Sequence, residues 1–171
     1  MKAVRIYRFC GPDVQVYDDV PRLKAGPGEA LVRICAAGVN PIDWKVRSGY
    51  MKEMFRNRLP IIPGVDMAGV IEIVGDGVPD FKKGDMVYGY LGVGGSGTYA
   101  QYVAAEATAL AHKPQSTDFI QAAALPLGSL VGWQMLFDID NLQSGQTVLI
   151  HGASGGVGTW RYSWPDGRAQ R

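Results

Sequence analysis

The chain has 171 residues, of which 47% are hydrophobic and 19% charged, and its 17 basic and 16 acidic residues leave a net charge of +1. Because no basic face or charged block stands out, the sequence predicts neither a nucleic-acid partner nor binding to an anionic membrane. No apolar run approaches the roughly 18 residues of a membrane-spanning helix. Met1–Ile6 is typical of a strand rather than of a secretory signal. Cys10 and Cys35 are the only cysteines, which favours a reducing, cytoplasmic location.

Short strand patterns separated by glycine and proline turns fill residues 1–110. After the first strand, further strands are predicted at Val14–Tyr17, Glu29–Ala36, Gly69–Gly75, Asp85–Gly89 and Thr98–Val103. Closely spaced strands of this kind indicate a β-barrel or a sandwich. The mixed, polar stretch Ile42–Asn57 between them is expected to form a short helix and a loop.

The pattern changes after Pro114. Ser116–Asp118 offers N-cap residues for a helix over Phe119–Ala124, and Pro126 ends that helix. A second, more apolar helix is predicted over Leu127–Phe137. Helical segments therefore follow the strand-rich part of the chain.

The most informative segment is Thr147–Ile150, which is typical of a buried strand and leads into a glycine-rich turn. The turn consists of Gly152, Ala153, Ser154, Gly155, Gly156, Val157 and Gly158. Small residues let the backbone approach a dinucleotide pyrophosphate closely, and a helix that begins there would present backbone N–H groups to it. The segment therefore indicates the start of an α/β nucleotide-binding domain, with an ordinary strand-to-helix turn as the alternative.

Several motifs occur in a recognisable order along the chain. They are Ala37–Lys45, Pro63–Gly69, Phe81–Gly89, Gly97–Tyr102, Ala124–Leu127 with Trp133, and Ala153–Gly158. On these motifs the chain resembles the zinc-free quinone oxidoreductases of the medium-chain dehydrogenase/reductase superfamily over residues 1 to about 159. The resemblance implies a mainly β GroES-like barrel followed by the start of an α/β Rossmann domain that is incomplete in this chain. It also implies NADPH as cofactor, reduction of quinones or other conjugated carbonyls by hydride transfer, and a homodimer for the full-length form.

Three regions are expected on this basis. Residues 1–113 would form the GroES-like domain, residues 114–159 the beginning of the NADP-binding Rossmann domain, and residues 160–171 an aberrant tail. Pro165 and Gly167 would break the helix that should follow the glycine turn. Because codons read in a shifted frame can restore a family-like helix, the tail is interpreted as a possible frameshift product of a longer gene.

Asn40 and Asp43 are the first candidate catalytic residues, since by resemblance their segment borders the nicotinamide and the substrate. An amide and a carboxylate at this spacing can hold a ring substituent or a water; alternatively, with Pro41 between them, they stabilise the loop. Tyr50 could line the quinone site, and surface packing is its alternative. Val131 stands where the family commonly has a threonine near the nicotinamide, so it joins Asn40 and the glycine turn as a cofactor-binding candidate.

No zinc site is expected. By resemblance, zinc-dependent relatives place a cysteine at the position of Asn40 and a His-Glu pair at the position of Val65–Asp66. His112 and His151 match no ligand spacing and are interpreted as structural or surface residues. Without a Lewis acid, hydride transfer depends on positioning and on hydrogen bonds to the developing oxyanion, which suits a quinone better than a simple alcohol.

Two alternatives to quinone reduction remain open at this point. The chain could be a non-catalytic GroES-like fragment, either inert or paired with a partner, or an enzyme that reduces enones or alkenals. Because Thr147–Ile150 lacks the rest of its sheet, we expect weak NADPH binding, an inactive truncated chain, and low solubility or association.

Overall fold

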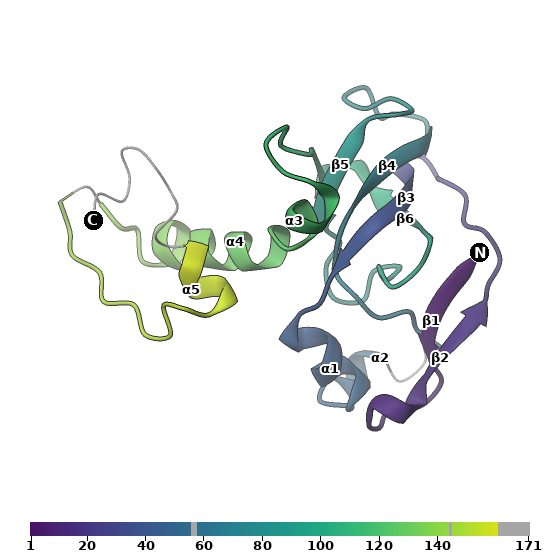
Figure 1. Ribbon diagram of the computed structural model, residues 1–171, viewed down its shortest axis with the longest axis horizontal. Helices are drawn as coiled ribbons and strands as arrows, with labels where there is room; N and C mark the ends of the chain where they lie inside the picture. The colour runs from purple at the N-terminus through teal and green to yellow at the C-terminus, as the bar shows by residue number, and fades with distance from the viewer. Residues whose placement is uncertain (56–57, 144, 161–171) are drawn as a thin grey trace. The chain divides into compact units, whose positions relative to one another are not determined.

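The computed structural model describes residues 1–55, 58–143 and 145–160 and divides the chain into two compact units, Met1–Ala124 and Leu125–Arg171. Figure 1 shows the ribbon of both units, with helices α1 to α5 and strands β1 to β6 labelled. Within the described residues, no helix combines the length and the apolar character that crossing a membrane requires.

An antiparallel five-stranded sheet forms the centre of the first unit (Figure 1). Its strand order is β6 (Tyr102–Glu106), β3 (Glu29–Gly38), β4 (Asp66–Val74), β5 (Met86–Tyr90) and β7 (Leu110–His112). The core beneath it contains Ala30, Val32, Met67, Ile71, Val87, Val103, Ala105 and Leu110. The sheet thus supplies the apolar interior of the unit.

Burial along β3 alternates only in part. Ala30 and Val32 are fully buried, whereas Arg33 and Cys35 are exposed. Leu31 lies between Ala30 and Val32 in the chain and is buried as well. A register shift between Leu31 and Val32 interrupts the regular alternation at this point.

A second sheet consists of β1 (Lys2–Ile6) and β2 (Gln15–Asp19), joined through the short 3-10 helix Pro12–Val14. Isolated bridges pair Ala3 with Ala100 and Ile6 with Ile61, which attach β1 to the segment before β6 and to the segment before β4.

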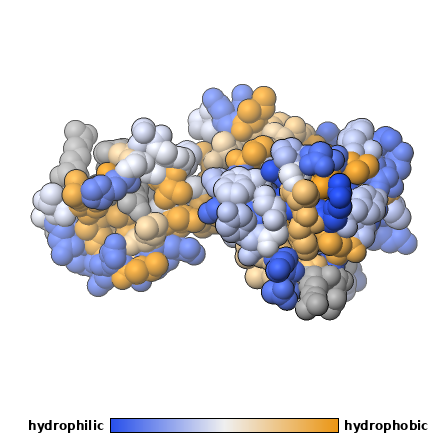
Figure 2. Space-filling view, turned by 90° about the horizontal axis from the view of Figure 1, so that it is seen from below, coloured by the Kyte–Doolittle hydropathy of each residue, from blue (hydrophilic) through white to orange (hydrophobic). Residues whose placement is uncertain are grey.

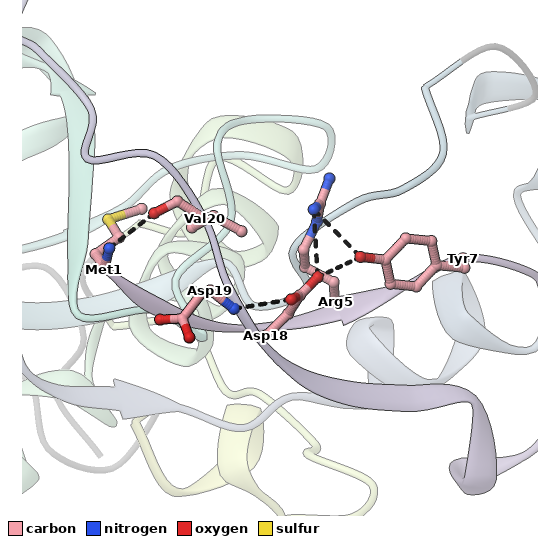
Figure 3. Close-up of polar contacts among 6 residues, drawn as sticks. All are labelled: Met1, Arg5, Tyr7, Asp18, Asp19 and Val20. Carbon is pink, nitrogen blue, oxygen red and sulfur yellow. Dashed lines mark hydrogen bonds and ion pairs between the residues drawn. The ribbon is translucent and has the colours of Figure 1, made fainter.

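Polar contacts stabilise the pairing of β1 with β2 (Figure 3). The amino group of Met1 donates a 2.7 Å hydrogen bond to the carbonyl of Val20, while Arg5 and Tyr7 both donate to the carboxylate of Asp18. Asp18 lies on β2 and the two donors on or directly after β1. The contacts therefore tie the C-terminal part of β2 to β1 and to the residues that flank β1.

Helices α1 (Pro41–Arg47) and α2 (Lys52–Phe55) occupy the stretch predicted to hold a short helix and a loop. The 3-10 helix Ala107–Ala109 joins β6 to β7. Helix α3 (Phe119–Ala123) packs on β3 and β4 within the first unit.

The predicted N-cap of α3 is confirmed. Asp118 Oδ1 accepts a 2.7 Å hydrogen bond from the backbone N–H of Gln121, and Gln121 Oε1 accepts one of 3.0 Å from the N–H of Asp118. Because α3 packs against the sheet, the first unit extends to Ala124, beyond the change in sequence pattern at Pro114.

The predicted strand Thr98–Val103 begins later than expected, since β6 starts at Tyr102. The backbone N–H groups of Thr98 and Tyr99 donate to the carbonyl of Pro63 instead of to a strand ladder. Gly97, with φ of +76°, makes the turn that directs them there.

In the second unit, α4 (Pro126–Trp133) continues as a π-helix over Gln134–Ile139, and α5 spans Gly156–Trp160. The predicted strand Thr147–Ile150 was wrong, because this segment is irregular and Leu149 is 80% exposed. A buried strand requires hydrogen-bonded neighbours on its sheet, and the described part of the unit provides none. The frameshift interpretation covers residues 160–171, and all of these except Trp160, the last residue of α5, lie outside the described residues.

Candidate functional site

Asn40 lies at the junction between β3 and α1. Its extended backbone (φ −123°, ψ 154°) makes it the N-cap of α1, and Pro41 occupies the first helical position, where no N–H is needed. Asp43, one turn into the helix, accepts a 2.7 Å hydrogen bond from the backbone N–H of Asn40 through Oδ2. Both candidates therefore have the loop-stabilising contact that the sequence offered as an alternative to catalysis.

The carboxylate of Asp43 has a second, distant partner. Tyr99 donates a 2.8 Å hydrogen bond from its hydroxyl to the same Oδ2 atom. Asp43 is only 7% exposed, so these two donors compensate a carboxylate that has lost most of its water. Burial, together with the bond to Asp43, holds the pKa of Tyr99 well above its usual range, against the opposing charge of Arg47.

Gly64 allows Tyr99 to reach this position. Its φ is +92°, and a Cβ atom there would lie 2.3 Å from Thr98 Oγ1 and 2.5 Å from Tyr99 Cδ1. Only glycine accepts both the backbone conformation and the close approach. The turn before β4 is therefore shaped to receive the Thr98–Tyr99 segment.

Asp66, the first residue of β4, completes the network from the other side. It is 1% exposed, and its Oδ2 accepts a 2.9 Å hydrogen bond from Asn40 Nδ2. The backbone of Asp66 is paired with Gly38 on one side and Tyr90 on the other. Burial, and then the charge of Asp66, raise the pKa of Tyr90.

We call Asp66, Asn40, Asp43 and Tyr99 the polar network. The sequence identified its two central members and missed Asp66 and Tyr99 as partners, although both lie in the motif segments quoted above. A carboxylate at the head of an apolar strand was the available signal for Asp66.

A small and mostly apolar pocket adjoins Asp43. It is lined by residues of α1, by Phe55 at the end of α2, by residues 61–65, and by residues 93–95. The nearby Thr98 hydroxyl is buried and has no hydrogen-bond partner among the described residues. Asp43 therefore lies at the edge of an apolar pocket, and the Thr98 hydroxyl nearby forms no hydrogen bond within the described residues.

Tyr50 is not brought into the polar network. It is 74% exposed, and its ring packs edge-to-face on Trp44 with centroids 5.5 Å apart. This is the surface packing that the sequence offered as its alternative. Val131 is half-buried on α4 in the second unit.

The glycine turn is compact. Gly152 has φ of +68°, and its carbonyl accepts a 2.9 Å hydrogen bond from the N–H of Gly155. A Cβ atom on Gly158 would lie 2.5 Å from that carbonyl oxygen and 2.7 Å from the Cα of Ala153. Glycine permits this close packing of backbone on backbone, as in a pyrophosphate-binding loop. That residues 152–158, Ser154 and Val157 included, hold the pyrophosphate stays a prediction.

Among residues 1–55, 58–143 and 145–160, no three His, Cys, Asp or Glu side chains gather in a way that could hold a metal ion. His112 packs against Phe81 with ring centroids 5.0 Å apart. His151, directly before the glycine turn, is exposed. The absence of zinc stays a prediction.

Comparison with known proteins identifies the family. Residues 26–115 match the alcohol dehydrogenase GroES-like domain. The quinone oxidoreductase of Rattus norvegicus is 40% identical over 159 residues, which cover 92% of this chain and 47% of the rat protein. A solved alcohol dehydrogenase superfamily protein from Novosphingobium aromaticivorans has a TM-score of 0.85 at 38% identity, covering 94% of this chain and 48% of that one.

A quinone oxidoreductase structure from Pseudomonas syringae has a TM-score of 0.82 at 36% identity, covering 92% of this chain and 47% of that one. The chain thus spans about half the length of the relatives it matches. It belongs to the alcohol dehydrogenase GroES-like family, within the medium-chain dehydrogenase/reductase superfamily.

Proposed function

We propose that this chain carries the GroES-like, substrate-binding part of an NADPH-dependent quinone oxidoreductase that works without zinc. The main support is the similarity to the rat quinone oxidoreductase across nearly the whole chain. The site adds a second argument: Asn40 is held by a buried carboxylate, whereas zinc chemistry would need a metal ligand at this point. A cytoplasmic location and a full-length homodimer belong to the same proposal.

Hydride transfer to a quinone requires little acid–base catalysis by side chains. When bound, NADPH supplies a hydride, and the carbonyl oxygen of the quinone gains negative charge as the hydride arrives. Hydrogen-bond donors fixed near that oxygen lower the barrier, because they need no reorganisation during the reaction. Asn40 Nδ2 is the donor that the polar network holds in place, which is why we assign it this role.

A hybrid enzyme tests the proposal. The matched 159-residue segment would replace its counterpart in the rat quinone oxidoreductase, and oxidation of NADPH by duroquinone would be followed at 340 nm. Duroquinone is chosen because its ring is fully substituted and cannot add to the exposed thiols of Cys10 and Cys35. We expect NADPH-dependent reduction that survives treatment with a zinc chelator.

Three outcomes of this assay would count against the proposal. A folded hybrid that binds NADPH without reducing duroquinone would favour the non-catalytic alternative. Faster turnover of an enone or alkenal than of any quinone would favour the other alternative. Loss of activity on chelation, restored by added zinc, would contradict the zinc-free part.

The 171-residue chain on its own is expected to bind NADPH weakly and to be inactive. Its glycine turn follows a segment that pairs with no strand in the described part of the chain, so few of the contacts of a dinucleotide site can form. Titration of NADPH fluorescence with the isolated chain measures this. Micromolar affinity would contradict the expectation.

A further inference from the structure

Asn40 is held through both its side chain and its backbone. Asp66 Oδ2 accepts a 2.9 Å hydrogen bond from Nδ2, and a capping-box arrangement ties Asn40 to Asp43 at the start of α1. Asn40 itself is only partly buried, so the amide lies between a fully buried carboxylate and a more open surface.

The chemistry of Asp66 decides which way the amide faces. An ionised carboxylate only accepts hydrogen bonds, so the opposite orientation would set Asn40 Oδ1 against an oxygen that cannot donate. Because Asp66 is 1% exposed, water cannot easily replace the Nδ2 donor. Asp66 therefore favours the orientation in which Nδ2 points toward β4.

An amide nitrogen carries two hydrogens, and Asp66 takes one of them. Across the described residues, no further acceptor bonds to Asn40 Nδ2. The second N–H is left for a ligand that offers a carbonyl oxygen.

We propose that Asp66 is a positioning residue that holds the Asn40 amide so that its second N–H donates to a ligand carbonyl. That the ligand is a quinone rests on the proposed function above. In this arrangement Asp66 does not touch the ligand and acts on it through Asn40.

The test is a ¹H–¹⁵N spectrum of the 171-residue chain, in which the two side-chain N–H signals of Asn40 are assigned and duroquinone is added as the probe. The variant is Asp66→Asn, which keeps the size of the side chain and removes its obligatory acceptor character. The matched control is Asp85→Asn, since Asp85 is also a largely buried carboxylate, 12% exposed, but bonds to Lys82 outside the polar network.

In the unsubstituted chain, we expect one Asn40 N–H signal shifted downfield and slow to exchange, and the other moved by duroquinone. Asp66→Asn should abolish the downfield shift and weaken the duroquinone response about tenfold, the effect of losing one charge-assisted hydrogen bond. Asp85→Asn should leave both signals in place.

Unchanged Asn40 signals in a folded Asp66→Asn chain would overturn the proposal, as would duroquinone that moves neither signal in the unsubstituted chain. Should Asp66→Asn fail to fold, acid titration of the unsubstituted chain decides instead. The downfield Asn40 signal must then follow the same midpoint as the Asp66 carboxyl carbon, and unequal midpoints would overturn the proposal.

The two proposals fail differently. Suppose that the parent hybrid enzyme reduces no quinone, while the Asn40 signals respond to Asp66→Asn and to duroquinone. The proposed function would then be wrong, and the positioning role of Asp66 would stand. An active parent hybrid whose kcat with duroquinone is unchanged by Asp66→Asn would remove the positioning role alone.

Discussion

The hydroxyl of Tyr99 donates a 2.8 Å hydrogen bond to the Asp43 carboxylate across 56 residues of sequence. This bond ties the segment before β6 to helix α1, and Asp43 in turn fixes Asn40. Two neighbouring elements of the site therefore depend on one buried carboxylate.

Replacing Tyr99 by phenylalanine removes that donor and leaves the buried carboxylate with one fewer partner. A hydrogen bond to a charged group contributes about 1.5–3 kcal/mol, so we expect Tyr99→Phe to lower the free energy of unfolding by about that amount. Urea denaturation measures it. The control Tyr50→Phe, at a 74% exposed tyrosine, should change the value by less than about 0.5 kcal/mol.

Alkaline pH should act on the same tyrosine. Because the fold raises the pKa of Tyr99 above its ordinary value of 10.0, it stabilises the neutral phenol. That contribution is complete below pH 10 and is lost as the pH rises further, since the unfolded chain then releases its proton first. The unfolding free energy should therefore fall less steeply above pH 10 in Tyr99→Phe than in the unsubstituted chain. Parallel curves would contradict this assignment.

Gly64 offers a test of close packing with a matched control. Gly64 and Gly84 have nearly the same φ, +92° and +93°, but a Cβ atom would collide with Thr98 and Tyr99 only at Gly64. Gly84→Ala should cost about 1–2 kcal/mol for the left-handed conformation, and Gly64→Ala should cost at least about 2 kcal/mol more because of overpacking. Equal melting temperatures for the two variants would show that the Thr98–Tyr99 segment can move away from the added Cβ atom at little cost in stability.

The second unit should promote association. Its exposed apolar side chains include Leu130, Trp133, Met135, Ile139, Val148 and Leu149. Figure 2 shows hydrophobic residues on the face of the second unit that is visible in this view. We expect sedimentation to reveal concentration-dependent self-association, and Leu149→Lys to reduce it at least about twofold because Leu149 is 80% exposed. A monodisperse monomer over the same concentrations would contradict this.

Features that depend on local chemistry were predictable from the sequence. The Asp118 cap of α3 requires only a side chain and a backbone N–H three residues away, and it was predicted correctly. The strands from β1 to β5 likewise follow their alternating or apolar patterns.

Features that depend on distant partners were not predictable. The strand expected at Thr147–Ile150 has the right residues but no neighbours to pair with in the described structure. Asp66 precedes the strand predicted at Gly69–Gly75, and only its burial beside Asn40 shows that it bonds to the Asn40 amide. Tyr99 reaches Asp43 because Gly64 leaves room for it, and no local pattern contains that information.

The most direct test of the proposed function is the kcat/KM for duroquinone of the hybrid enzyme with and without Asn40→Ala. Loss of a fixed donor to the developing oxyanion should lower kcat/KM about 100-fold or more, while the KM for NADPH changes little. A kcat/KM within about twofold of the parent hybrid would show that Asn40 only caps α1 and does not stabilise the oxyanion.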